Sequence, residues 1–332
     1  MNLQIYKSAQ ENAVWREMSH FGRFRCSGSE AAALLHHLTT NDIKNLHPGA
    51  GCDAALINSK ARVLDWLTIY RLEDEFLVVT SPNRRPIFQP HFQKFVLFRQ
   101  DVKIEDVTDT TAMLGLFGSR IEEVLTPLGA ADIMAEPLNA HRVLTVDNVT
   151  VHIARTQRLP FGGVLLWSQD GNGLRRLVQQ SGQPLCDNET FNVLRIEAGL
   201  PVAGLELTED INPWEAGLDA MISLSKGCYN GQEVVARLNT YKKVKQSLRG
   251  LKLDEAVLPG ERAVLRAEGR AAGFVTSSVQ SPRFGPIALA YVRGDYGEAG
   301  RRLEVESEGV INNATVTALP FAAEPFAAAD ED

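Results

Sequence analysis

Cysteine is scarce in this chain, and its cysteines are not paired. The four cysteines are Cys26, Cys52, Cys186 and Cys228, and no two of them form a C-x-x-C pair. This spacing argues against a disulfide framework and against a zinc knuckle. We therefore expect reduced thiols in a cytoplasmic protein, with no bound metal.

Long apolar runs are also absent. The N-terminal stretch MNLQIYKSAQENAVWREM mixes polar and apolar residues, which is not typical of a secretory signal peptide. No segment has 18 consecutive apolar residues, the length that a membrane-spanning helix needs. We expect no membrane partner.

Basic residues are fewer than acidic residues in this chain. The chain carries 34 Lys and Arg residues against 41 Asp and Glu residues, which gives a formal net charge of −7 at pH 7. Proteins that bind a nucleic-acid backbone usually present an excess of positive charge. We therefore expect no direct nucleic-acid partner.

Several common catalytic motifs are missing. The sequence contains no G-x-S-x-G, no GxxxxGK[ST], no H-E-x-x-H and no G-x-G-x-x-G. Its seven histidines form no cluster with the spacing of metal ligands. A functional site must therefore be sought among less familiar residue patterns.

The hydrophobic pattern predicts a mixed fold. Helical spacing of Ala31, Leu34, Leu35 and Leu38 predicts an amphipathic helix, and residues 50–80 read as three strands of an antiparallel meander. From His141 onward, strands and helices alternate without the regularity of βαβ units. This pattern favours the α+β class.

The hydrophobic pattern changes after Tyr241. Six short segments of alternating apolar and polar residues follow, and they predict the strands of a small closed barrel. We divide the chain into a first α+β unit at 1–110, a second at 111–245 and a barrel at 246–320. An Ala-rich acidic tail at 321–332 is expected to be flexible.

The most specific segment is KGCYNGQE, at residues 226–233. Asn230 and Glu233 have N-cap and N3 spacing ahead of the helical run VVARLN, so Cys228 should lie just before a helix N-terminus. The positive end of that helix and the nearby Lys226 would favour the thiolate. The sulfur could then act as a nucleophile or as a soft-metal ligand.

A second interpretation of this segment stays open. Cys228 could be a small packed hydrophobic residue, with Gly227 and Gly231 serving only as turn residues. If the thiol is reactive, the same glycines would let the backbone approach a ligand closely. The residues alone favour neither interpretation.

Glu197 lies on an apolar helix face. In the helical run FNVLRIEAG, the apolar arc consists of Phe191, Val193, Leu194 and Ala198, and Glu197 falls inside it. A buried carboxylate is costly without partners. A ligand with paired N–H donors would compensate it, and so would a salt bridge to Arg195 or Arg237.

Asp65 interrupts the apolar strand RVLDWLTIY. Strand alternation puts Asp65 on the face opposite to Trp66. The carboxylate either faces a cavity or lies at a solvated edge of the sheet.

These residues lead to a family resemblance. KGCYNGQEVVAR resembles the signature of YgfZ-type folate-binding proteins, and RIEAGLPVAGLELTEDINPWEAGL resembles a segment that they share with the aminomethyltransferase, or T-protein, of the glycine cleavage system. The similarity extends to LTTNDIKNLHPGAGCDAALINSKARVLDWLTIYRL and to the C-terminal barrel. It therefore covers most of the chain.

The resemblance implies two interlocked mixed α/β, ferredoxin-like subdomains around a central channel that binds tetrahydrofolate, followed by a six-stranded barrel. It also implies that Glu197 recognises the pterin ring. The reacting residues would then be Cys228 and Lys226, and the cofactor-binding residues would be Glu197, Asp65, Tyr229, Gly227, Gly231, Gln232, Glu233 and Arg237. We further expect Glu197 and Cys228 to line one shared cavity.

The resemblance also implies a function. YgfZ-type proteins support the assembly or repair of iron–sulfur clusters and, indirectly, tRNA modification by iron–sulfur enzymes, so iron–sulfur proteins or assembly factors would be partners. The alternative is a folate-dependent aminomethyltransferase or another one-carbon transferase. Against that alternative, Trp66 replaces the second of the paired acids typical of aminomethyltransferases, and those enzymes lack the KGCY cysteine.

Overall fold

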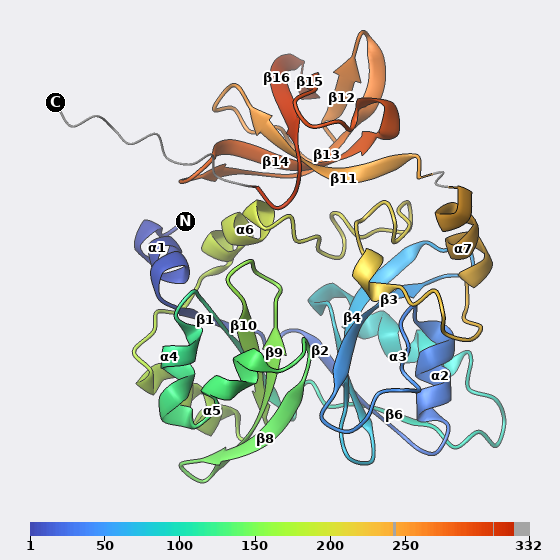
Figure 1. The fold of residues 1–332 in the computed structure, drawn as a ribbon, viewed down its shortest axis with the longest axis vertical. Coiled ribbons are helices and arrows are strands. Elements are labelled where there is room, and N and C mark those ends of the chain that lie inside the picture. Colours follow the sequence, from blue (N-terminus) through green and yellow to red (C-terminus); the bar gives the residue numbers. More distant parts are fainter. Residues whose placement is uncertain (242–243, 308, 322–332) are drawn as a thin grey trace.

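A computed structural model describes residues 1–241, 244–307 and 309–321 of the chain. It contains two five-stranded sheets with helices packed on them, and a closed six-stranded barrel (Figure 1). The predicted fold class is confirmed. Apart from Phe321, the predicted tail lies outside the described residues.

The first sheet is antiparallel and has the order β3-β4-β5-β2-β6. Its strands are β2 (Gly22–Ser27), β3 (Gly51–Ile57), β4 (Val63–Arg71), β5 (Phe76–Thr80) and β6 (Lys103–Asp106). Helices α2 (Ala31–Leu38) and α3 (Arg85–Gln93) bury their apolar faces against it, in one core cluster. The predicted meander β3-β4-β5 and the helix α2 are both present.

The second sheet has the order β1-β7-β10-β9-β8. Its strands are β1 (Val14–Glu17), β7 (Ala112–Phe117), β8 (His141–Val146), β9 (Val149–Thr156) and β10 (Gly163–Ser168), with α4 (Ile121–Leu125) and α5 (Gly171–Gln180) packed in its core. Strand β1 precedes the whole first sheet in the chain but pairs with β7. The two α/β units are therefore interlocked.

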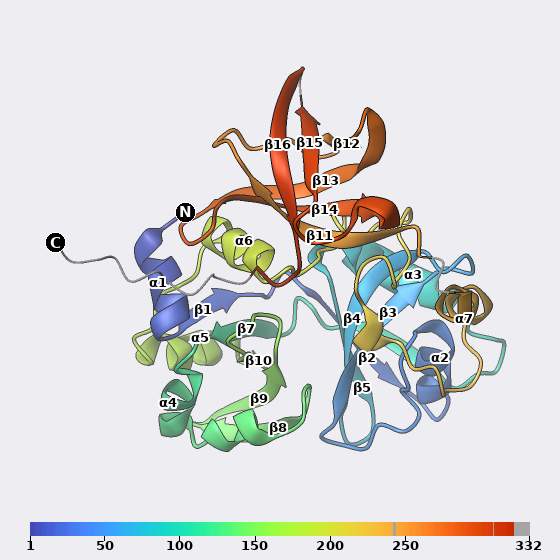
Figure 2. The same ribbon diagram turned by 45° about the horizontal axis from the view of Figure 1, so that its top comes forward.

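The barrel closes in the order β11-β14-β13-β12-β15-β16. Its strands are β11 (Gln246–Leu253), β12 (Val264–Ala267), β13 (Arg270–Ser281), β14 (Gly285–Arg293), β15 (Arg302–Ser307) and β16 (Val310–Thr317). It lies across both α/β units, next to α6 (Asn188–Glu197) (Figures 1 and 2). Helix α7 (Gln232–Tyr241) precedes it, and α1 (Leu3–Glu11) packs against α6.

Short 3₁₀ turns complete the described structure, at Pro82–Arg84, Thr126–Leu128, Ala131–Ala135, Asp219–Met221 and Gly294–Tyr296. Among the helices that the structure describes, none is long and apolar enough to cross a membrane.

A buried ion pair fastens the barrel to the α/β units. Arg195 of α6 lies 3.0 Å from Glu206, and both side chains are almost fully buried. Glu206 also accepts hydrogen bonds from the hydroxyls of Thr276 and Ser277 in β13. The carboxylate is therefore compensated, as a buried charge must be, and it fixes the loop after α6 against the barrel.

Candidate functional site

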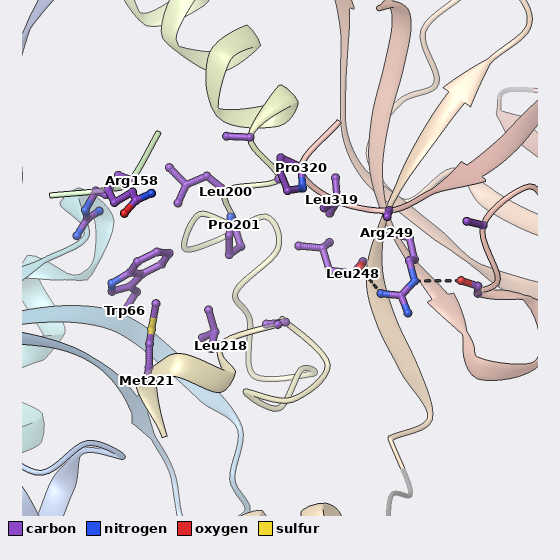
Figure 3. A pocket seen from close by; sticks show the side chains of 18 of the residues that line it. Trp66, Arg158, Leu200, Pro201, Leu218, Met221, Leu248, Arg249, Leu319 and Pro320 are labelled. Atoms are coloured by element: carbon purple, nitrogen blue, oxygen red, sulfur yellow. Dashed lines mark hydrogen bonds between the residues drawn. The ribbon is translucent and has the colours of Figure 1, made fainter. Parts of the chain in front are cut away.

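A cavity of about 690 Å³ lies where the two α/β units and the barrel meet. Figure 3 shows its walls: Trp66 and Arg158 come from the α/β units, Leu200, Pro201, Leu218 and Met221 from the loop after α6, and Leu248, Arg249, Leu319 and Pro320 from the barrel and the segment that follows it. Because all three parts of the fold contribute, the cavity exists only in the assembled chain.

Trp66 and Arg158 form a polar and aromatic wall. The Arg158 guanidinium carbon lies 5.0 Å from the centre of the Trp66 ring, and its Nη2 donates to Thr68 Oγ1 over 2.9 Å. Trp66 Nε1 donates to Asp53 over 2.9 Å, and Asn139 Nδ2 donates to the same carboxylate over 3.1 Å. Sequence reasoning missed Asp53 and Arg158, although a charge inside the strand GCDAALI was a visible signal.

Two further hollows adjoin this cavity. One, of about 800 Å³, is lined by Glu197 and shares Ala198 and Pro320 with the central cavity. The other, of about 290 Å³, shares Trp66 and Arg158 with it. The three hollows therefore follow one another, with the central cavity in the middle.

Glu197 is buried, as its position on the helix wheel predicts. Its Oε1 accepts hydrogen bonds from Tyr6 Oη over 2.8 Å and from Ser281 Oγ over 2.5 Å. Burial raises the pKa of this carboxyl group. The proposed salt bridges are wrong, because Arg195 pairs with Glu206 and Arg237 is exposed on α7.

Asp65 is also buried, so the solvated-edge alternative is wrong. Its carboxylate accepts hydrogen bonds from the backbone N–H groups of Trp66 over 2.8 Å and Ser81 over 3.1 Å. Burial raises its pKa to about 6. Asp65 is not among the residues that line the central cavity, where its neighbour Trp66 stands instead.

Lys226 holds the KGCYNGQE segment against α2. Its buried Nζ donates to the carbonyl oxygens of His36, Thr39 and Asn41, each over 2.6 Å. An ammonium group at a helix C-terminus compensates carbonyls that have no partner within the helix. Burial lowers the pKa of Lys226 to about 8. Its structural role is therefore to cap α2.

The end of the segment packs on the turn between β3 and β4. Gly231 has a φ of +81°, and a Cβ there would lie 2.6 Å from the carbonyl oxygen of Asn58, so only glycine fits. Helix α7 begins at Gln232. Asn230 therefore lies outside the helix and is not its N-cap, and its backbone N–H donates to the carbonyl oxygen of His37.

Cys228 and its neighbour Gly227 are exposed. Tyr229 is buried, with its ring centre 4.9 Å from Lys226 Nζ, and burial raises its pKa to about 12. On α7, Gln232 is half-buried, whereas Glu233 and Arg237 are exposed. The segment thus presents its thiol on the protein surface.

The structure does not bring Glu197 and Cys228 together. Helix α6, which carries Glu197, packs against α1, whereas the Cys228 loop lies beside α2 on the other side of the molecule (Figures 1 and 2). Cys228 is not among the residues that line the Glu197 hollow. The expectation of one shared cavity is wrong, because Lys226 and Asn230 bind the Cys228 loop to the end of α2, whereas Glu197 faces Tyr6 and the barrel.

Comparison with known families identifies the group to which the fold belongs. The GCVT N-terminal domain matches residues 4–226, and the glycine cleavage T-protein C-terminal barrel domain matches residues 246–322. The chain belongs to the glycine cleavage T-protein family. Aminomethyltransferases of Saccharopolyspora erythraea and Moorella thermoacetica are each 31% identical to it. These alignments cover 95% and 93% of this chain, and 89% and 86% of the respective relatives.

Two other comparisons add to this result. A chloroplastic protein of Arabidopsis thaliana, whose name assigns it to the transferases, is 29% identical over 87% of this chain and 67% of its own length. The crystal structure of the glycine cleavage system aminomethyltransferase T from Bartonella henselae superposes with a TM-score of 0.84 at 23% identity, covering 96% of this chain and 89% of that one. The second comparison shows the shared fold.

Proposed function

We propose that this protein is a YgfZ-type member of the family and binds a reduced folate, tetrahydrofolate or a one-carbon derivative, in the central cavity. The observation that carries the proposal is the cavity itself, whose volume suits a small organic ligand and whose wall pairs an indole with a guanidinium. Such a wall suits the stacking of a flat aromatic ring. The adjoining hollows suit an elongated ligand.

In this proposal Glu197 recognises the pterin ring. Its hollow adjoins the cavity at Ala198 and Pro320, and its carboxylate already accepts hydrogen bonds from the hydroxyls of Tyr6 and Ser281. A pterin presents paired N–H donors that a carboxylate accepts well. Replacement of these hydroxyls by the ligand would keep the buried carboxylate satisfied.

Cys228 supplies the second part of the proposed function. Its exposed thiol would serve as a redox group or as a transient ligand during the assembly or repair of iron–sulfur clusters, and would thereby support tRNA modification by iron–sulfur enzymes. Lys226 and Gly231 hold the loop in place, and residues 222–227 connect Met221 on the cavity wall to the surface thiol. The partners would be iron–sulfur proteins or cluster-assembly factors.

A folate-dependent aminomethyltransferase is the second candidate, because the bacterial relatives named above carry that name. The local geometry favours it less. Trp66 occupies the cavity where the paired-acid pattern expects a carboxylate, and Asp65 is held by the backbone of Ser81 instead. Formation of 5,10-methylenetetrahydrofolate from an aminomethyl donor would support this candidate over the iron–sulfur role, and would agree with a folate in the central cavity.

Calorimetric titration with 5-formyltetrahydrofolate tests the folate site. We expect the wild type to bind and Trp66→Ala to bind at least tenfold more weakly. Trp214→Ala is the matched control, because its indole bonds to the Val235 carbonyl oxygen and does not line the cavity. Equal affinities for the wild type and Trp66→Ala would refute this placement of the ligand.

A cellular assay tests the thiol. In cells that lack the protein, Cys228→Ser should fail to restore the activity of an iron–sulfur enzyme, while Cys52→Ser, at a half-buried cysteine, should restore it. Full rescue by Cys228→Ser would remove the proposed role of Cys228 and leave the folate site untouched.

A further inference from the structure

The smallest of the three hollows is lined in part by arginine residues, and the folate proposal gives no role to one of them, Arg16. It lies beyond the wall formed by Trp66 and Arg158, and its volume is about 290 Å³. Strand β1 contributes Arg16 to its lining, and helix α6 contributes Phe191 and Arg195. Most of the remaining lining is apolar, so charged groups there are poorly hydrated.

The charges in this hollow have one sign. In the part of the chain that the structure describes, its lining includes Arg16, Arg158 and Arg195 but no Asp or Glu. Arg195 is neutralised by Glu206, whereas neither Arg16 nor Arg158 forms an ion pair with any of the described residues. Two guanidinium groups therefore face a small, mostly apolar space, and neither has a carboxylate in direct contact among the described residues.

Of these two arginines, Arg16 is the one whose guanidinium nitrogens are buried without hydrogen-bond partners among the described residues. Its side chain is only 9% exposed, and its Nε and Nη1 are buried without a hydrogen-bond partner among the described residues. Its guanidinium carbon lies 3.9 Å from the centre of the Phe191 ring. The carboxylate of Asp187 is occupied by the N–H and hydroxyl groups of Thr190. A buried, unpaired charge is costly, and a ligand anion would remove that cost.

We propose that this hollow is a carboxylate-binding compartment, in which Arg16 receives the carboxylate of a bound ligand and Arg158 flanks it at the border with the central cavity. The fork of N–H groups on a guanidinium matches the two oxygens of a carboxylate, and Phe191 holds that fork flat from one side. A carboxylate bound end-on by Nη1 and Nη2 would give Nη1 the partner that it lacks.

The carboxylate could come from two sources. Because the hollow adjoins the central cavity at Trp66 and Arg158, the glutamate tail of a bound folate could extend into it. A separate small carboxylic acid could also enter it beside the folate. Only the first source rests on the proposed folate function.

Calorimetric titration of the full chain distinguishes these sources. The probes are 5-formyltetrahydrofolate, 5-formyltetrahydropteroate, which lacks the glutamate, and glutarate. The variant is Arg16→Met, and the control is Arg176→Gln, at an exposed arginine of α5. If the folate tail is the ligand, Arg16→Met weakens folate binding tenfold or more and leaves pteroate binding unchanged. If a separate acid is the ligand, Arg16→Met abolishes glutarate binding alone.

A thermal unfolding scan without ligand completes the test. Because Arg16 forms no ion pair with the described residues and its Nε and Nη1 lack hydrogen-bond partners there, Arg16→Met should leave the Tm unchanged or raise it. The proposal is overturned if Arg16→Met changes the binding of none of the three probes, or if it lowers the Tm by many degrees, which would show a structural role instead. If the wild type binds glutarate but does not bind 5-formyltetrahydrofolate, the folate proposal is overturned and the carboxylate site remains.

Discussion

Trp66 Nε1 donates a hydrogen bond to Asp53 Oδ1 over 2.9 Å, and this contact orients the aromatic wall of the cavity. Asp53 lies on β3 and Trp66 on β4, while Asn139, which donates to Oδ2, belongs to the other α/β unit. The wall is therefore set by contacts between the interlocked units. Ligand binding and the docking of the two units should depend on the same carboxylate.

Replacing Asp53 by Ala should affect both properties. The change leaves the donors of Trp66, Thr68 and Asn139 without their shared acceptor. We expect the free energy of unfolding to fall by about 2 to 3 kcal/mol, and the affinity for 5-formyltetrahydrofolate to fall about tenfold. Urea unfolding and calorimetry measure these effects. Asp74→Ala, at an exposed turn, is the control and should change neither.

The carboxyl group of Asp65 should make stability depend on pH. Its pKa is about 6 in the folded chain against an ordinary value of 3.8, because the group is buried. Between pH 4 and 6 the folded state therefore keeps a proton that the unfolded state has released, so the contribution of Asp65 to stability falls as pH rises.

Comparison of the wild type with Asp65→Asn isolates this contribution. From pH 4.5 to pH 7.5, the stability of the variant relative to the wild type should rise by about 2 kcal/mol, given 1.36 kcal/mol per pKa unit. Urea unfolding at the two pH values measures it. A difference between the two proteins that does not vary with pH would contradict the assignment.

Lys226 should be needed for stability. Lys226→Met removes the donor of three carbonyl oxygens at the end of α2 and should lower the free energy of unfolding by about 2 to 3 kcal/mol. Lys44→Met, at an exposed neighbouring position, should cost less than about 0.5 kcal/mol. If both variants are equally stable in urea, the capping role is wrong.

Cys228 should be the first cysteine to be alkylated. It is exposed, whereas burial raises the pKa of each of the thiols of Cys26, Cys52 and Cys186 to about 12. Iodoacetamide at pH 7.5, followed by mass spectrometry, should give a single adduct on Cys228. Cys228→Ser should give none on the same time scale, and earlier labelling of another cysteine would rule this order out.

Hydrophobic periodicity was enough to predict most of the fold. The meander β3-β4-β5 and the barrel strands alternate along the chain, and in the meander and in the β12-β13-β14 part of the barrel the neighbours in sequence are also neighbours in the sheet. Strand β1 was not predicted, because its partner β7 lies about a hundred residues away in the chain and a four-residue strand has too little pattern. Interlocking of this kind is a tertiary property.

The site was predicted less completely, and for the same reason. The burial of Glu197 followed from its helix face, but its partners Tyr6 and Ser281 are 191 and 84 residues away. Lys226 was placed beside Cys228 because the two are close in sequence, whereas its ammonium group reaches α2, some 190 residues earlier. Arg16 carried no sequence signal, since its burial depends on the packing of α6 over β1.

The most direct measurement of the folate proposal is a crystal structure with 5-formyltetrahydrofolate at saturating concentration. We predict ligand density in the central cavity, with an aromatic ring of the folate packed against Trp66 and Arg158. An empty cavity under these conditions, or folate bound elsewhere on the molecule, would contradict the proposal.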